Sequence, residues 1–424
     1  MRYLLIILIL SLVSAPELKS QYYFPPADNS EWETASFGET GWDSTHTEEL
    51  LNFLADNNSK GFIILHKGRL VMEEYFGEFT MDSLWYWASA GKTLTAFLTG
   101  LAQEQGYLSI DDPVSDHLGS GWTSMPEDKE RQIRIKHQIT MTTGLENEVE
   151  DEYCTEPQCL KYRTDPGKRW FYHNAPYTLT ADVIESATGQ NYNEYTREQF
   201  ASLGFRGFWF MQGYNRLRLS TVREMAKFGL LCLSRGIWNG DTILRDRDYF
   251  QNMVNSSQQL NPSYGYLWWL NGKSGYKPPV IDYLIDGSML PGAPDEMWCA
   301  MGKNEQRFYV IPGDDIVVVR MGDLAEGGFL DFDKGLWYIL DKIIYGSVGI
   351  KVISKGSTDI IMENNQLFAK EQTQGDKLEL YGLSGQLIKR SSGILSISGM
   401  PRGAYFLKIS KQNGDIIRGK IMLY

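Results

Sequence analysis

The chain has 424 residues, of which 42% are hydrophobic and 22% charged, a composition typical of folded globular proteins. Its 41 lysines and arginines against 53 acidic residues give a net charge of −12. This negative balance argues against nucleic acid as a partner, because phosphate binding needs a basic face, and the sequence contains no glycine-rich phosphate-binding loop.

Residues 1–20 have the pattern of a signal peptide. Arg2 gives a positive start, an apolar run extends from Leu4 to Val13, and small or polar residues continue to Ser20. The apolar run is too short to span a bilayer. We therefore expect export across the inner membrane, giving a secreted or cell-surface protein. An uncleaved anchor is the alternative.

The main part, residues 21–345, mixes strands and helices. GFIILHKGRLVMEEYF predicts two strands around Lys67-Gly68, and RFYVIPGDDIVVVRMG predicts a hairpin around residues 312–315. Strands at both ends with helices between them predict an α+β architecture, in which helices flank one antiparallel sheet and form an inserted region. The three predicted helices are Lys92–Glu104, Asn174–Thr188 and Thr221–Ser234.

The stretch WASAGKTLTAFL contains the first candidate catalytic residues. Ser89 and Lys92 are three positions apart at the start of a helix, so their side chains should share one face. Burial among apolar groups such as Trp85 and Trp87 would lower the pKa of the lysine and let it act as a base. An ordinary helix start is the alternative. A second Ser-x-x-Lys, at Ser274, runs into two prolines and cannot form a helix.

Two of the four cysteines lie in an acidic segment, ENEVEDEYCTEPQC, for which we expect a solvated loop, with gating as the alternative. Cys154 and Cys159 are close enough to form a local disulfide. Cys232 and Cys299 are expected to be buried thiols. No cysteine or histidine pair has metal-site spacing, which argues against a metal. For the reaction considered below we expect neither a metal nor an organic cofactor.

Tyr172 and Asn174, in KRWFYHNAPY, form the only Tyr-x-Asn triplet of the chain, at the start of a predicted helix. The phenol could take or relay the proton of Ser89, and the amide could hold Lys92 and a substrate carbonyl. His173, between them, is expected to point away and to be structural.

The aromatic segment YGYLWWLNG predicts a core strand, with the lining of a substrate cleft as the alternative. A third candidate element follows it. In CAMGKNEQRFYV, a strand edge ending at Gly302 could run along a bound substrate. A backbone N–H at Gly302 or Lys303 could join that of Ser89 as an oxyanion hole.

These three elements resemble those of the serine β-lactamase-related family, which includes class C β-lactamases, penicillin-binding-type peptidases, esterases and amide hydrolases. The resemblance covers most of residues 30–345 and implies a β-lactamase/transpeptidase-like fold. It also implies that Ser89 is the acylated nucleophile, Lys92 its base partner, Tyr172 the proton shuttle and Asn174 a positioning group.

The third motif departs from the family pattern. Related β-lactamases and D,D-peptidases carry Lys or His, then Thr or Ser, then Gly on this strand, where they bind a substrate carboxylate. This chain has Ala300-Met301-Gly302. We therefore expect hydrolysis of a small-molecule or peptide-like ester or amide. The alternatives are a β-lactamase or D-amino-acid-specific peptidase on the same site, or an inactive secreted binding protein.

The composition changes near residue 346. All twelve tryptophans precede it, and residues 351–424 carry eleven lysines and arginines against six acids. Short alternating runs separated by turns predict a linker at 346–355 and a small β-sandwich at 356–424. LELYGLSGQLIKR and LSISGMPRGAYFLKIS resemble the sorting domain of the type IX secretion system, which implies that secretion machinery as a partner. A generic β-sandwich accessory module is the alternative.

Overall fold

The computed structural model describes residues 22–28, 31–279 and 281–346, and in the tail 360–363, 366–369, 376–382, 386–397, 400, 403–412 and 416–423. The predicted signal peptide and residues 347–355 of the predicted linker lie outside these residues. Among the described helices, none has the length and apolar character needed to cross a membrane.

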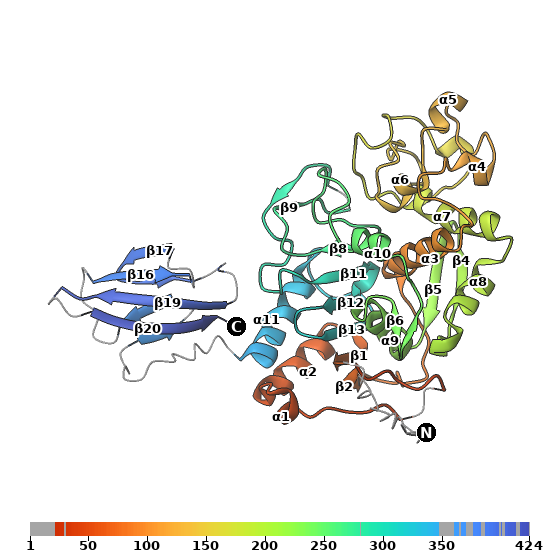
Figure 1. Ribbon diagram of the computed structural model, residues 1–424. Helices are drawn as coiled ribbons and strands as arrows, with labels where there is room; N and C mark the ends of the chain where they lie inside the picture. Colours follow the sequence, from red (N-terminus) through yellow and green to blue (C-terminus); the bar gives the residue numbers. More distant parts are fainter. Residues whose placement is uncertain are drawn as a thin grey trace, which may run out of the picture.

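A six-stranded antiparallel sheet forms the centre of the main body (Figure 1). In the order β2-β1-β13-β12-β11-β8, the first and last hairpins of this part of the chain lie side by side, which confirms the predicted α+β fold. The strands are β1 (Ser59–His66), β2 (Arg69–Tyr75), β8 (Trp269–Leu270), β11 (Trp298–Gly302), β12 (Gln306–Ile311) and β13 (Ile316–Gly322).

Helices cover both faces of this sheet. Successive residues of a strand point to opposite faces, and two neighbours on β12 mark the two sides. Phe308 packs against an aromatic ring of α9 (Val222–Leu233), whereas Arg307 forms an ion pair with Asp333 of α11 (Asp331–Tyr345) on the other face. The sheet is therefore the middle layer of three.

The inserted helical region lies between the two hairpins in sequence, as predicted. Its two longest helices, α3 (Lys92–Glu104) and α7 (Asn174–Thr188), have the predicted bounds and pack on each other.

The main body contains further short elements. Its other helices and 3-10 turns are α1 (Phe37–Thr40), η1 (Ser44–His46), α2 (Thr47–Asp56), η2 (Ala88–Gly91), α4 (Ser115–Leu118), α5 (Glu127–Glu130), α6 (Ile135–Ile139), η3 (Pro157–Cys159), α8 (Tyr192–Gln199), η4 (Ala201–Leu203), α10 (Arg247–Met253) and η5 (Lys303–Glu305). Short strands are β3 (Trp85–Tyr86), β4 (Phe208–Gln212), β5 (Asn215–Ser220), β6 (Ile237–Trp238), β7 (Asp241–Thr242), β9 (Gly275–Tyr276) and β10 (Ile285–Asp286).

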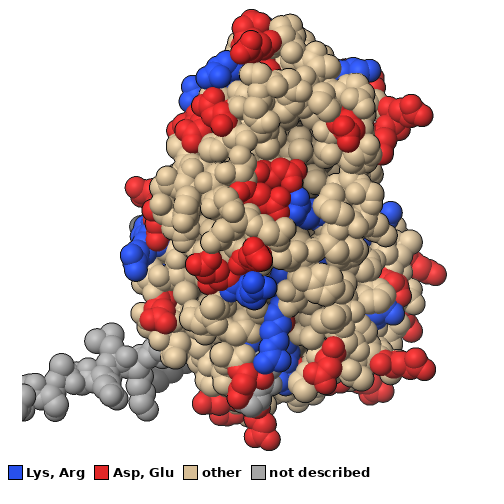
Figure 2. All heavy atoms as spheres, turned by 90° about the vertical axis from the view of Figure 1, so that its right-hand side faces the viewer, with Lys and Arg blue, Asp and Glu red and all other residues tan. Residues whose placement is uncertain are grey.

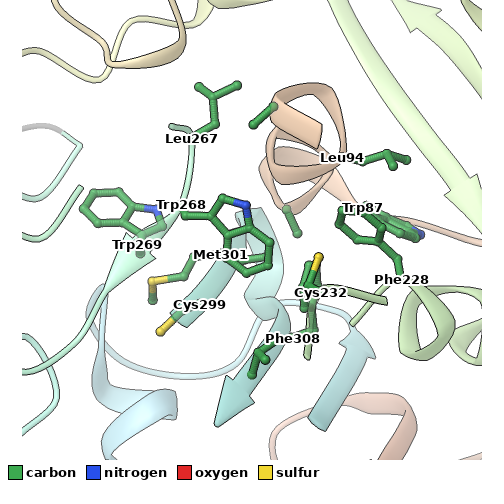
Figure 3. Packing of buried hydrophobic residues seen from close by; sticks show 14 of the residues in the cluster. Trp87, Leu94, Phe228, Cys232, Leu267, Trp268, Trp269, Cys299, Met301 and Phe308 are labelled. Atoms are coloured by element: carbon green, nitrogen blue, oxygen red, sulfur yellow. The ribbon is translucent and has the colours of Figure 1, made fainter. Parts of the chain in front are cut away.

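An aromatic core joins the sheet to α3 and α9 (Figure 3). The ring of Trp87 lies 6.2 Å from that of Phe308 and 6.1 Å from that of Phe228. Cys232 and Cys299 are buried thiols in the same cluster, as predicted. This packing fixes the segment that leads into α3.

The tail forms two small antiparallel sheets, β17-β16-β19-β20 and β14-β15-β18. Leu367 and Leu395 of the smaller sheet share one hydrophobic cluster with Leu378, Leu380 and Leu407 of the larger one, so the two sheets bury a common core. The strands are β14 (Ile360–Glu363), β15 (Gln366–Ala369), β16 (Lys377–Tyr381), β17 (Leu387–Ser392), β18 (Leu395–Ser396), β19 (Gly403–Ser410) and β20 (Ile416–Leu423).

Candidate active site

The sequence predicts that Ser89 lies at the start of the helix that carries Lys92. In the structure it lies in the 3-10 turn η2, immediately before that helix, α3. The preceding residue, Ala88, has φ 47°, a left-handed conformation that residues other than glycine seldom adopt. Trp87 anchors the turn, since its indole N–H donates to Ser220 Oγ at 2.7 Å. The hydroxyl of Ser89 is thus presented, half-exposed, from a firmly held backbone.

Lys92 Nζ joins two of the predicted site residues. It donates to Ser89 Oγ at 3.1 Å and to Asn174 Oδ1 at 2.9 Å. Only 4% of the lysine surface is exposed. Burial lowers the pKa of Lys92 to about 7, and the carboxylate of Glu152 acts in the opposite sense. A large fraction of the amine is therefore unprotonated near neutral pH and able to accept the serine proton.

Tyr172 lies beside the amine of Lys92, together with Ser89 and Asn174. The centre of its ring lies 5.0 Å from Lys92 Nζ, and the side chain stacks on Trp269 at 5.8 Å. Burial raises the pKa of Tyr172 well above its usual range, against a hydrogen bond with Ser89 that lowers it. The phenol therefore keeps its proton at neutral pH and is suited to relaying one, while Lys92 is the group that titrates.

β11 brings Gly302 against the turn that carries the serine. A methyl group on Gly302 would lie 2.4 Å from the carbonyl oxygen of Trp87 and 3.0 Å from the backbone nitrogen of Ala90, so only glycine fits this approach. Lys303, the next residue, is exposed. The strand therefore lies directly against the segment that carries Ser89.

Arg307 fixes the peptide between Gly302 and Lys303. Its Nη1 donates to the carbonyl oxygen of Gly302 at 2.6 Å, and its Nε donates to Asp333 at 2.9 Å. Because the peptide is trans and planar, the N–H of Lys303 points away from Arg307. The arginine therefore sets the direction of one of the two candidate oxyanion donors.

The remaining positions of the third motif offer no polar side chain. Ala300 is fully buried, and Met301 is 5% exposed and belongs to the hydrophobic cluster shown in Figure 3. Within the described residues, β8 pairs only with Trp298 and Cys299 on this side of β11. Residues 300 to 302 therefore have no strand partner on that side among the described residues, although all three are buried.

The aromatic rings over Lys92 are not those expected from the sequence. Trp87 is part of the core, and Trp85 lies 4.6 Å from Lys60 Nζ. Besides Tyr172, the ring facing Lys92 belongs to Tyr177, whose centre is 4.1 Å from Nζ. Its position three residues after Asn174 on one helix is the sequence signal that could have identified it.

The acidic segment before Tyr172 is closed by the predicted disulfide between Cys154 and Cys159. Glu152 in this loop is exposed and influences the charge of Lys92, so the loop lies within electrostatic reach of the site. His173 is buried, and burial lowers its pKa to about 4, as expected for a structural residue.

The negative net charge of the chain is visible on its surface. Acidic side chains are spread widely over the face of the molecule shown in Figure 2.

Residues 59–333 match the sequence model of the family described as "Beta-lactamase". The chain is 22% identical over 310 residues to an uncharacterised protein of Alkalihalophilus pseudofirmus, a match that covers 63% of this chain and 84% of that protein. Among solved structures it resembles a putative 6-aminohexanoate-dimer hydrolase from Bacillus anthracis, with 18% identity, a TM-score of 0.57, and coverage of 76% and 90% of the two chains. It also resembles a putative β-lactamase from Bacteroides dorei, with 18% identity, a TM-score of 0.57, and coverage of 72% and 99%. At these identities the likeness to the solved structures shows a shared fold.

Proposed function

The chain belongs to the β-lactamase family of serine hydrolases, and we propose that it is an esterase or amidase that works through an acyl-enzyme on Ser89. The observation that carries this proposal is the placement of Lys92 Nζ between Ser89 Oγ and Asn174 Oδ1, at 3.1 and 2.9 Å, in a buried setting that brings its pKa to about 7.

In the first half of the reaction, the unprotonated amine of Lys92 takes the hydroxyl proton of Ser89 while Oγ attacks the substrate carbonyl carbon. The N–H groups of Ser89 and Lys303 stabilise the negative charge that forms on the carbonyl oxygen. As the C–O or C–N bond breaks, the proton passes from Lys92 to the leaving group through the Tyr172 hydroxyl. Water then cleaves the acyl-enzyme by the reverse route and returns the proton to Ser89.

The third motif supports an ester or amide without a carboxylate beside the scissile bond. Ala300 and Met301 have no group that could bind one, and both are buried. The side of β11 that β8 leaves unpaired suits a linear amide, whose N–H and C=O groups could pair with the strand. The similar Bacillus anthracis protein is named a putative 6-aminohexanoate-dimer hydrolase, and this name adds linear amides to the substrates to be tried.

A labelling experiment tests the nucleophile. A fluorophosphonate probe should form an adduct on the peptide that contains Ser89, and Ser89→Ala should remove both the adduct and the hydrolysis of p-nitrophenyl esters. Ser274→Ala is the matched control, since Ser274 begins the second Ser-x-x-Lys of the chain. Undiminished hydrolysis by Ser89→Ala would refute the assignment.

A substrate panel separates the candidate activities. We expect turnover of p-nitrophenyl esters or linear amide oligomers to exceed that of nitrocefin and of D-amino-acid amides. The opposite ranking would favour the β-lactamase or peptidase alternative. A well-folded protein that forms no adduct with any probe would favour a binding protein on this scaffold.

We further propose that the protein is exported and sorted to the cell surface or medium by the type IX secretion system. The signal-peptide pattern of residues 1–20, the disulfide between Cys154 and Cys159, and the sorting-domain resemblance of residues 356–424 support this proposal. Fusing residues 346–424 to an exported reporter should place the reporter outside a cell that has this machinery, and retention in the periplasm would contradict it.

A further inference from the structure

Lys92 Nζ has a close neighbour that the proposed reaction does not use. The ring centre of Tyr177 lies 4.1 Å from Nζ, nearer than the 5.0 Å of the Tyr172 ring. Tyr177 and Asn174 are three residues apart on α7, so one helix face presents both side chains to the lysine. Tyr177 is 6% exposed, and the contact is therefore made away from solvent.

The stereochemistry of the amine shows what this ring can do. A protonated lysine has three N–H groups, and the three nearest acceptors around Nζ are Ser89 Oγ, Asn174 Oδ1 and the face of the Tyr177 ring, while the Tyr172 ring lies farther away. A neutral lysine has two N–H groups and one lone pair. To take the serine proton, the lone pair must point at Ser89 Oγ, so the two N–H groups must find their acceptors elsewhere.

We propose that Tyr177 is a positioning residue that aims the Lys92 lone pair at Ser89. One N–H of the neutral amine is held by Asn174 Oδ1 and the other by the electron-rich face of the Tyr177 ring. After proton transfer the same ring face stabilises the ammonium. This inference rests on the proposed function and adds a role for the ring of Tyr177, not for its hydroxyl.

The surroundings of Tyr177 support a role for the ring alone. Its hydroxyl lies 3.4 Å from Thr95 Oγ1, which also accepts a 2.9 Å hydrogen bond from Tyr192. Thr95 therefore keeps a partner when the Tyr177 hydroxyl is removed. Burial raises the pKa of Tyr177 to about 12, so the ring is uncharged wherever Lys92 titrates.

Few other titratable groups act on the lysine. From the acidic loop, Glu152 favours the protonated amine. From the segment before α7, Tyr172 faces it with a phenol that stays protonated. From η2, the Ser89 hydroxyl accepts a hydrogen bond from the lysine. From β5, the charge of Arg216 lowers the pKa of Tyr177 and so acts on the ring's own hydroxyl. A change confined to the Tyr177 ring leaves all of these in place.

Two variants of the full chain separate the ring from the hydroxyl. The readout is the pH profile of kcat/KM for a p-nitrophenyl ester between pH 5 and 9. Tyr177→Phe keeps the ring and should stay within about twofold of the wild type, with an unmoved acid limb. Tyr177→Leu should lower the plateau about tenfold and move the acid limb down by about half to one pH unit, because the protonated lysine loses its ring partner.

The direction of the shift distinguishes positioning from structural damage. A loosened site would admit water to Lys92, raise its pKa and move the acid limb upward. An upward shift, an unmoved limb in Tyr177→Leu, or equal damage from Phe and Leu would each overturn the proposal. If Tyr177→Leu does not fold, pentafluorophenylalanine at position 177 keeps the shape of the ring but removes its electron-rich face, and the same downward shift is expected.

The proposed function and this inference fail separately. If Ser89→Ala remains active, the acyl-enzyme itself is refuted. If Ser89→Ala is inactive while Tyr177→Leu keeps the wild-type pH profile, the nucleophile stands and only the role of Tyr177 is refuted.

Discussion

Replacing Lys92 by methionine should stabilise the folded state while it removes activity. Burial lowers the pKa of Lys92 from 10.5 to about 7 in the folded chain, whereas an unfolded chain leaves the lysine at its ordinary value. Between these two pH values the unfolded state binds a proton that the folded state lacks. The free energy of unfolding of the wild type therefore rises with pH across this window, and methionine removes that contribution.

The size of the effect follows from the same pKa shift. Below pH 7 the amine is charged in both states, and the folded chain bears the full penalty of a buried ammonium. Lys92→Met should be more stable there, by up to about 5 kcal/mol. From pH 6 to pH 9 this advantage should shrink by about 3 kcal/mol, since each pH unit above the folded pKa restores about 1.4 kcal/mol to the wild type.

Urea unfolding at pH 6 and pH 9, followed by tryptophan fluorescence, measures this difference. All twelve tryptophans precede residue 346, so the signal reports the main body and not the C-terminal sheets. Lys168→Met, at an exposed lysine, is the control and should not change the pH dependence. If the difference between the wild type and Lys92→Met is the same at both pH values, the lysine does not titrate in this range and the reasoning is wrong.

Gly302→Ala should slow acylation at least tenfold, because its methyl group would lie 2.4 Å from the Trp87 carbonyl oxygen. Burst kinetics measures the acylation rate. The control is Gly292→Ala, which has open space around it and should behave as the wild type. Tyr172→Phe should reduce kcat by about 10²-fold or more through loss of the relay, and a loss below threefold in steady-state assays would show that the phenol is not needed. A chain ending at Gly346 should fold and hydrolyse the same esters at the same rate. Loss of turnover in a folded chain of this length would show that the predicted domain boundary is misplaced.

The parts of the site that were predictable depend on local geometry. The spacing of Ser89 and Lys92 places both side chains on one side of a helical turn, and the structure gives a contact of 3.1 Å. The bounds of α3 and α7 also follow from local patterns, and Asn174 starts α7 as expected. The structure differs from this prediction in the turn that carries Ser89, which is a 3-10 turn ahead of α3 and not the first turn of the helix.

The parts that were missed depend on packing between distant segments. Whether a tryptophan or a tyrosine covers Lys92 depends on how α3 meets α7, and residues 92 and 177 are far apart in sequence. The ion pair between Arg307 and Asp333 joins a strand to a helix across the sheet, so no local pattern reveals that it holds the carbonyl of Gly302. The approach of Glu152 to Lys92 likewise requires the folded course of the acidic loop.

The stretch of β11 that β8 leaves unpaired among the described residues is only three residues long, from residue 300 to 302. The N–H and C=O groups of an antiparallel strand alternate between its two edges, so residues 300 to 302 turn the backbone groups of only one or two residues toward the side that β8 leaves unpaired. The same shortness guards against filament formation, because so small an edge cannot recruit a whole strand from a neighbouring copy.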